Sequence, residues 1–227
     1  MADNRGYYGS DGVSSQGAYS ANHYDRRGYN YGPAFFDATH NFVWSGTYDL
    51  PIGKGHSWGN AWHPVVNTIF GGWGVSSIIS AHTGFPITIT ATDRSLQNPR
   101  GSARPNQIGR PTVTNKPDCY IYNPLNGACA GISGTVVFAE PALGTFGNAG
   151  VGSVRAPGYF SWDFGVGKSF YMMEHYLGFR AEFFNFTNTP SFSPPDRTFA
   201  PTSRTFGQIT DTVSPPRIIE FALKFYF

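Results

Sequence analysis

The last eleven residues, RIIEFALKFYF, constrain the fold of this chain more than any other segment. Bulky apolar side chains occupy every second position, and side chains alternate between the two faces of a β-strand. One face would carry Ile219, Phe221, Leu223, Phe225 and Phe227. The other would carry Ile218, Glu220, Ala222, Lys224 and Tyr226. Because the ends of soluble domains usually fray and are polar, the fold class depends on whether the rest of the chain repeats this pattern.

The same alternation recurs along the chain. It predicts strands over residues 39–50, 72–84, 159–171, 176–186 and 217–227. Their lengths are close to the ~9–11 residues that a tilted membrane strand needs. Two irregularities stand out: residues 87–90 extend the second strand beyond Pro86, which would mark a bend or an unpaired edge position, and Lys168 interrupts the apolar face of the third.

The composition also favours strands. Aromatic residues make up 17% of the chain and charged residues 13%, against roughly 25% charged in ordinary soluble domains. A net charge of +2 gives no reason to expect nucleic acid as a partner. No apolar run reaches the ~18 residues of a transmembrane helix, and the start, MADNRGYYGSDG, lacks the apolar centre of a signal peptide. We therefore expect a chain that begins inside a longer parent sequence, or an incomplete reading frame.

The connections between the predicted strands alternate in length. Residues 1–38, 91–158 and 187–216 form long segments, residues 51–71 an intermediate one, and residues 172–175 a short turn. Long outer loops and short inner turns are typical of outer-membrane barrels. The sequence thus predicts an all-β fold, an antiparallel transmembrane β-barrel segment of about five long strands with long outer loops. In isolation these strands would form an open curved sheet.

Several stretches resemble the C-terminal barrel region of TonB-dependent outer-membrane receptors, specifically the Oar-like group. Their order and spacing carry the resemblance. They are DATHNFVWSGTYDLPIGKG (37–55), IFGGWGVSSIISAHTGFPITI (69–89), APGYFSWDFGVGKSF (156–170), YLGFRAEFFNFTNTPSF (176–192), TFGQI (205–209) and PPRIIEFALKFYF (215–227). The resemblance implies a barrel of about 22 strands with a plugged lumen. It also implies uptake of a bulky nutrient with energy from the inner membrane.

This chain departs from the family pattern, because it has no room for a plug domain and shows no N-terminal coupling box. We therefore expect residues 39–227 to be the C-terminal barrel strands of such a receptor, not active alone, with residues 1–38 as an outer loop or flexible N-terminal segment. The implied location is the outer membrane. The implied partners are outer-membrane lipid, the barrel-assembly machinery, the plug and remaining strands of the parent receptor, and, through the plug, the inner-membrane energy-coupling protein.

The resemblance also gives the final strand a role. It implies that the barrel-assembly machinery reads a closing strand that ends in an aromatic residue. The residues in question are Phe221, Leu223, Phe225 and Phe227. The alternative is that these side chains only face lipid in the apolar band and its aromatic girdle, and the two interpretations are compatible.

Four charged residues lie on the polar parity of the last two predicted strands: Arg180, Glu182, Glu220 and Lys224. If these strands pair antiparallel, opposite charges are expected opposite one another. The charges would form either a solvated channel wall or a contact surface for a plug.

Cys119 and Cys129 lie in the long connection 91–158. Two cysteines in an oxidising compartment usually pair. Closing so short a loop would stabilise it by roughly 3 kcal/mol in the chain-entropy model. We expect an outer loop closed by a structural disulfide rather than a redox site.

Patterns of enzyme chemistry are weak. Gly165–Ser169 reads GVGKS, but a phosphate-binding loop needs glycine where Trp162 stands. The histidines lack metal-ligand spacing, and no nucleophile elbow accompanies Asp37 and His40. We expect no enzyme, cofactor or metal. The alternatives are a secreted β-sandwich that binds carbohydrate through its aromatic residues, which would need polar outer faces, and an extracellular hydrolase, for which no catalytic constellation is visible.

Overall fold

The computed structural model describes residues 31–96, 102–172 and 174–227. Most of the predicted outer loop at residues 1–38 therefore lies outside the described residues. The chain divides into two compact units. The sheet unit comprises His40–His82, Tyr159–Ser191 and Val213–Phe227. The loop unit comprises the described residues of the segments up to Thr39, Thr83–Gly158 and Phe192–Thr212.

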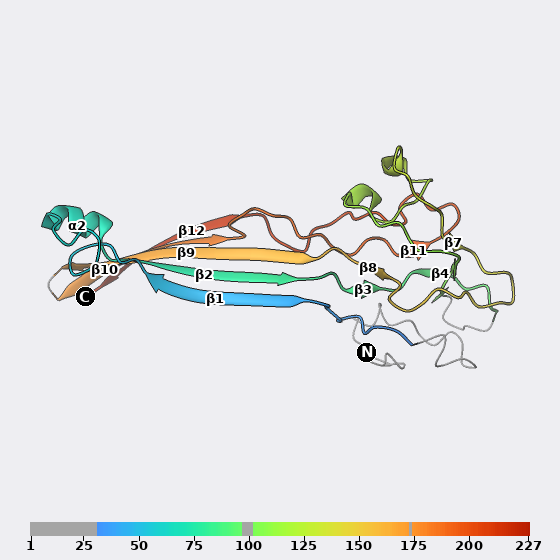
Figure 1. Ribbon diagram of the computed structural model, residues 1–227, viewed down its shortest axis with the longest axis horizontal. Helices are drawn as coiled ribbons and strands as arrows, with labels where there is room; N and C mark the ends of the chain where they lie inside the picture. Colours follow the sequence, from blue (N-terminus) through green and yellow to red (C-terminus); the bar gives the residue numbers. More distant parts are fainter. Residues whose placement is uncertain (1–30, 97–101, 173) are drawn as a thin grey trace. The chain divides into compact units, whose positions relative to one another are not determined.

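In the described residues the sheet unit contains one antiparallel sheet of five strands, in the order β1-β2-β9-β10-β12 (Figure 1). These are β1 (Asn41–Asp49), β2 (Trp73–His82), β9 (Tyr159–Met172), β10 (His175–Phe184) and β12 (Ile218–Tyr226). Strands β1 and β12 form the two edges. The five long strands and the all-β, antiparallel fold expected from the alternation are confirmed.

The register keeps one set of side chains on one face across the whole sheet. Ala181 lies opposite Val166 on one side and opposite Phe221 on the other, and Val166 lies opposite Val75. A slip of one residue at any pair would turn one apolar set to the other face. The sheet therefore has an apolar face and a polar face along its full width.

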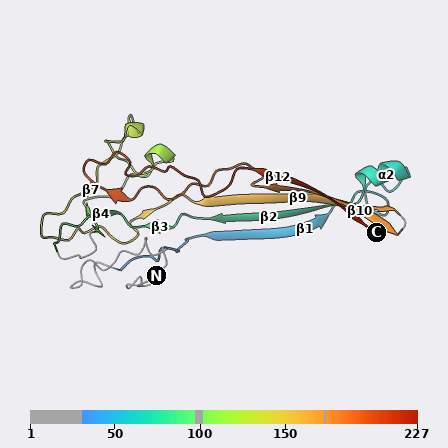
Figure 2. The same ribbon diagram turned by 180° about the vertical axis from the view of Figure 1, so that it is seen from behind.

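The connections leave the sheet from two different ends. Because neighbouring strands run antiparallel, the β1–β2 connection, the turn at Glu174 and the C-terminal end of β12 lie at one end, here called the turn end. The β1–β2 connection contains the helix α2 (Pro64–Phe70). In Figure 2, as in Figure 1, α2 and the C-terminus lie at this same end of the sheet.

Helix α2 is short and is capped at both ends. Pro64 at its first turn lacks the N–H group that would have no helical partner there. The Nδ1 atom of His63 accepts a hydrogen bond from the Val65 amide at 3.4 Å, and the Gly71 amide closes the last turn on the Asn67 carbonyl at 2.9 Å. No helix in the described residues is long and apolar enough to cross a membrane.

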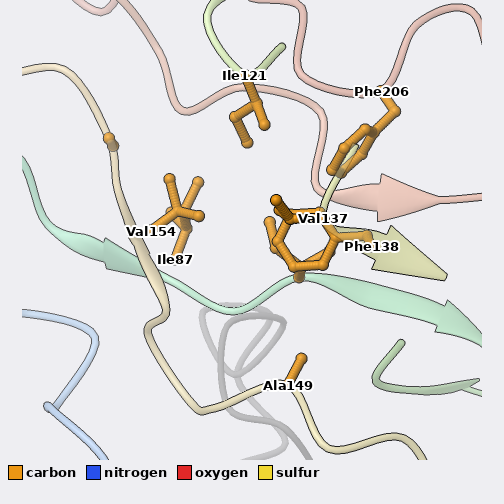
Figure 3. Packing of buried hydrophobic residues seen from close by; sticks show 9 residues of the cluster. Ile87, Ile121, Val137, Phe138, Ala149, Val154 and Phe206 are labelled. Atoms are coloured by element: carbon orange, nitrogen blue, oxygen red, sulfur yellow. The ribbon is translucent and has the colours of Figure 1, made fainter. Parts of the chain in front are cut away.

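The loop unit is a folded body with its own core. Its short strands are β3 (Pro86–Ile87) with β8 (Val154–Arg155), β4 (Thr90–Thr92) between β5 (Ser102–Ala103) and β11 (Thr198–Phe199), and β6 (Asn106–Gln107) with β7 (Phe138–Ala139). The buried core consists of Ile87, Ile89, Ile121, Val137, Phe138, Ala149, Val154, Ala156 and Phe206. Figure 3 shows Val154 beside Ile87 and Phe206 beside Phe138.

The expected extension of the second strand through residues 87–90 is wrong. Strand β2 ends at His82, and Pro86–Ile87 pairs with Val154–Arg155 in a separate sheet. Gly84 explains the change of direction, because a Cβ atom there would lie 1.6 Å from the carbonyl oxygen of Ala156. Only glycine allows this close approach of two backbones.

A disulfide and an ion pair stabilise the loop unit. Cys119 and Cys129 form a disulfide between the short 3₁₀ helices η2 (Pro117–Cys119) and η3 (Gly127–Cys129), and both sulfur-bearing residues are buried. Ahead of β1, the carboxylate of Asp37 pairs with the guanidinium of Arg155 at 2.7 Å. The same guanidinium donates to the carbonyls of Asp37 and Gly84 at 2.9 and 3.1 Å. These bonds fasten the chain segment that leads into the sheet.

Candidate functional site

The apolar face of the sheet is dominated by aromatic side chains. It carries Phe42, Trp44 and Tyr48 from β1, Trp73, Val75 and Ile79 from β2, Phe160, Trp162, Phe164 and Phe170 from β9, Leu177, Phe179 and Phe183 from β10, and Ile219, Phe221, Leu223 and Phe225 from β12. Rings contact one another across strands, with centroids 6.4 Å apart for Phe179 and Phe221. On the edge strand, Phe221 is 72% exposed and Leu223 69%. A face with apolar side chains this exposed is suited to an apolar environment.

The polar face is built mostly from small and hydrophilic side chains, with Val43, Ile78, Phe184 and Ile218 as its bulky apolar residues. Serine, threonine and glycine are frequent on it, as at Ser45, Thr47, Ser76, Gly165 and Gly167. Toward the turn end this face is hollowed by a cavity of about 1150 Å³. Asp49, Arg180 and Lys224 line the cavity from the strands, and Lys54 and Asn67 line it from the β1–β2 connection.

Three tyrosines form an aromatic group at the turn end of the polar face. The Tyr176 ring stacks on the Tyr226 ring at a centroid distance of 4.1 Å and lies 5.7 Å from the Tyr171 ring. The ammonium group of Lys224 sits 4.7 Å from the centre of the Tyr226 ring. The sequence analysis missed this group, although the shared parity of the three tyrosines on neighbouring strands could have revealed it.

The four predicted charges do share the polar face, but their expected pairing is wrong. Glu182 lies directly opposite Glu220, while Arg180 faces Ala222 and Lys224 faces Gly178. The Arg180 guanidinium instead bonds the Glu182 carboxylate of its own strand at 2.6 Å. The register that keeps apolar residues on the other face also places the two glutamates together, because strand registry moves all side chains at once.

Residues 1–220 match the model of a family described as an outer membrane beta barrel domain. The chain belongs to this family. Its sheet is thus part of an outer-membrane β-barrel, and the protein is located in the outer membrane. Strands of such barrels alternate between lipid and lumen, so the apolar face is the lipid face and the hollowed polar face is the lumen face. Neither a curated protein nor a solved structure matches the chain significantly.

In this barrel segment Lys168 is a cation on the lipid face. Its ammonium group donates to the Gly71 carbonyl and lies 5.7 Å from the Trp73 ring centre and 5.0 Å from that of Phe170. The side chain is 8% exposed. Backbone carbonyl and ring faces compensate the charge, which explains how a cation interrupts an otherwise apolar face. The surrounding GVGKS segment is part of strand β9, so it does not form a phosphate-binding loop.

The aromatic residues of the closing strand point to the lipid face. Phe221, Leu223 and Phe225 have the lipid-face parity of β12, and Phe227 follows the strand with 96% of its side chain exposed. The Phe225 and Phe227 rings stack with centroids 6.3 Å apart. This geometry fits contact with lipid. Their role in barrel assembly stays a prediction.

A buried asparagine holds the start of β12, and the sequence analysis missed it. Asn185 is 3% exposed and has a positive φ of 49°. Its amide nitrogen atom Nδ2 donates to the carbonyls of Pro215 and Thr189 at 3.0 and 3.2 Å, and its backbone N–H donates to the Asp163 carboxylate at 2.9 Å. Asparagine tolerates this left-handed conformation better than most residues. Asn185 therefore ties the loop end of β10 to β9 and to the segment leading into β12.

In the loop unit, Tyr120 links the disulfide region to β8. Its phenol donates a hydrogen bond to the Arg155 carbonyl at 2.9 Å. Burial raises the pKa of Tyr120 above its ordinary value. The disulfide at Cys119 is adjacent in sequence, so the covalent tie and this hydrogen bond hold the same part of the unit. The arrangement is structural and places no reactive thiol at this position.

Proposed function

We propose that the chain supplies C-terminal barrel strands of a TonB-dependent receptor of the Oar-like group, which takes up a bulky nutrient across the outer membrane. One observation carries the proposal. Five of the six stretches that resemble this group coincide with the five long strands, in the same order: β1, β2, β9, β10 and β12. The hollow lumen face supports a transport role, since it presents polar side chains to the interior of the barrel.

The proposal assigns a task to each part of the protein. The lipid face contacts outer-membrane lipid, and β12 with Phe227 is the element that the barrel-assembly machinery reads. The lumen charges at Arg180, Glu182, Glu220 and Lys224 line the channel or contact a plug. The plug and the remaining strands complete the receptor and connect it to the inner-membrane energy-coupling protein. The protein binds and moves its ligand without chemical change, so it has no catalytic role.

The secreted β-sandwich that binds carbohydrate is less well supported. A sandwich buries the apolar face of one sheet against a second sheet. In the described residues the apolar side chains of the edge strands stay open, with Phe42 56% and Phe221 72% exposed. The family match to an outer-membrane barrel points the same way.

Loss of energy coupling tests the transport proposal. We would delete the gene that encodes this protein in its native host and compare growth on a panel of large carbohydrates, peptides and metal chelates with growth of a strain lacking the energy-coupling protein. The proposal expects the deletion strain to lose growth on one of the substrates that the coupling-deficient strain has lost. A substrate that needs this protein but not the coupling protein would show a passive pore instead.

A further inference from the structure

Helix α2 has two chemically different sides. At 3.6 residues per turn, Val65, Val66, Ile69 and Phe70 fall on one side, and Asn67 and Thr68 on the other. The side chains on the apolar side are 39–62% exposed, from Val66 39% to Val65 62%. On the polar side, Oδ1 of Asn67 accepts a hydrogen bond from the Lys54 amide at 2.6 Å, and both polar residues line the lumen cavity. The polar side is therefore occupied, and the apolar side is open.

Trp62 extends this apolar side, and Trp58 is a second exposed tryptophan in the same β1–β2 connection. Trp58 is 72% exposed and Trp62 37%, and the Trp62 ring lies edge-on to Phe70 at 6.4 Å. Trp73 donates its indole N–H to the Ile69 carbonyl at 3.0 Å. Since Trp73 begins β2 on the lipid face, the apolar side of α2 is continuous with the lipid face of the barrel.

The position of Lys168 indicates the depth of the end of α2 in the membrane. It lies opposite Trp73 in the register, and its ammonium group bonds the carbonyl of Gly71, the residue that follows α2. A cation on a lipid-facing position is tolerated where its head group reaches the polar interface. Tryptophan is enriched at the same depth. A cation and a tryptophan side by side at the end of α2 are the residue types expected at the boundary between hydrocarbon and water.

We propose that α2, together with Trp58 and Trp62, lies in the plane of the membrane interface at the turn end and anchors the barrel to the phospholipid surface. An interfacial helix places its apolar side among the upper acyl chains and its polar side toward water or protein. Val65, Ile69 and Phe70 would contact lipid, while Asn67 and Thr68 face the lumen. The inference rests on the barrel and its lipid face and does not depend on the transported nutrient.

Site-directed spin labelling tests this proposal. Cys119 and Cys129 are bonded to each other, so neither competes for the label, and any further cysteine of the parent protein is replaced by serine first. We would prepare Ile69→Cys and its neighbour Thr68→Cys in the protein purified from outer membranes and reconstituted into phosphatidylethanolamine–phosphatidylglycerol nanodiscs. A Phe221→Cys variant on the lipid face serves as reference. Collision of the label with oxygen, which concentrates in lipid, is compared with collision with a water-soluble nickel chelate.

The proposal expects the label at position 69 to behave like the label at position 221, with several-fold more oxygen than nickel access relative to position 68. Equal nickel access at positions 69 and 68, with position 221 still protected, would show that α2 lies in water. Low access of both probes at position 69 would show that protein covers it. Nickel access at position 221 would contradict the lipid face itself. Each of these three results overturns the anchor.

Discussion

At the residue scale, some residues stabilise the fold through hydrogen bonds within the chain, whereas others are exposed and make few contacts with it. Asn185 and Tyr120 are fixed by hydrogen bonds to backbone carbonyls of distant segments, namely Pro215 and Arg155. Phe227 makes a ring contact only with Phe225 among the described aromatic pairs and is 96% exposed. A large apolar residue with so few contacts contributes little to the stability of the chain itself. We therefore expect Phe227 to contact lipid or another protein.

Removal of Phe227 should impair assembly more than it impairs the finished barrel. We expect Phe227→Ala to lower the amount of folded protein in the outer membrane several-fold, with little change in the thermal unfolding of the fraction that does fold. Heat-modifiable migration on gels measures both quantities. Phe221→Ala, which changes the same residue type within β12, is the matched control and should have the smaller effect on folded amount. Equal folded amounts of wild type and Phe227→Ala would refute the assembly role.

Ionisation of Tyr120 should lower the stability of the loop unit at alkaline pH. Burial raises the pKa of Tyr120 above 10.0 in the folded protein, so the folded state holds this proton at pH values where the unfolded state releases it. The resulting stability is complete below pH 10 and is lost as the pH rises through the folded-state pKa. Tyr120→Phe should remove this pH dependence, at a cost of about 0.5–1.5 kcal/mol at neutral pH for the lost hydrogen bond to Arg155.

The phenolate absorbance of wild type minus that of Tyr120→Phe isolates this titration. In folded protein the difference should rise at a higher pH than in denatured protein. Coincidence of the two curves would contradict the assigned effect of burial.

At the scale of elements, the sheet was predictable and the loop unit was not. Alternation located the five long strands, because a period of two sustained over nine or more residues is typical of a half-buried strand and does not match the period of a helix. The loop unit uses strands of two or three residues, such as Pro86–Ile87 with Val154–Arg155. Such strands carry no period, and their partners are far apart in the chain. The placement of Glu182 opposite Glu220 was also beyond the sequence, since parity fixes the face of a residue but not the register.

Exchange of one glutamate should strengthen the β10–β12 pair. Like charges directly opposite one another destabilise a strand pair, and opposite charges contribute about 0.2–1 kcal/mol. Glu220→Lys would place an ammonium group opposite the Glu182 carboxylate and should raise the unfolding temperature in detergent. Glu220→Gln, which removes the repulsion without adding an attraction, should fall between the variant and the wild type. A lower unfolding temperature for Glu220→Lys would show that the two glutamates do not repel each other in the assembled barrel.

The disulfide should set the protease resistance of the loop unit. Its loop spans a sequence separation of 10 residues, for which the chain-entropy model gives roughly 3 kcal/mol. The Cys119→Ser, Cys129→Ser double variant should be cleaved by added protease within residues 102–158 at concentrations that leave the wild type intact. The long strands should stay protected, because they belong to the other unit. Equal cleavage of the two proteins would show that the core of the loop unit is sufficient without the covalent tie.

At the scale of the whole molecule, the five-stranded sheet needs further strands that pair with its two edges. Strands β1 and β12 are the two edges of the five-stranded sheet in the described residues. Bacterial membrane barrels close with at least about eight strands. An open edge leaves backbone donors and acceptors unsatisfied, and each such group costs several kcal/mol in hydrocarbon. The exposed apolar side chains of β1 and β12 add an aggregation hazard in water.

The 227 residues produced alone should therefore not form a monomeric pore. We expect aggregation in buffer and heterogeneous oligomers in detergent, because edge-to-edge pairing of β1 and β12 from different copies satisfies the open backbone groups. Refolding in detergent, followed by light scattering for mass and planar-bilayer recording for conductance, measures both properties. Substitution of Phe221 and Leu223 by serine is the control, since it lowers the apolar area but leaves the open edges, and should reduce aggregation in buffer without producing conductance. A monodisperse monomer with a steady conductance would contradict this expectation and would mean that the chain closes a small barrel by itself.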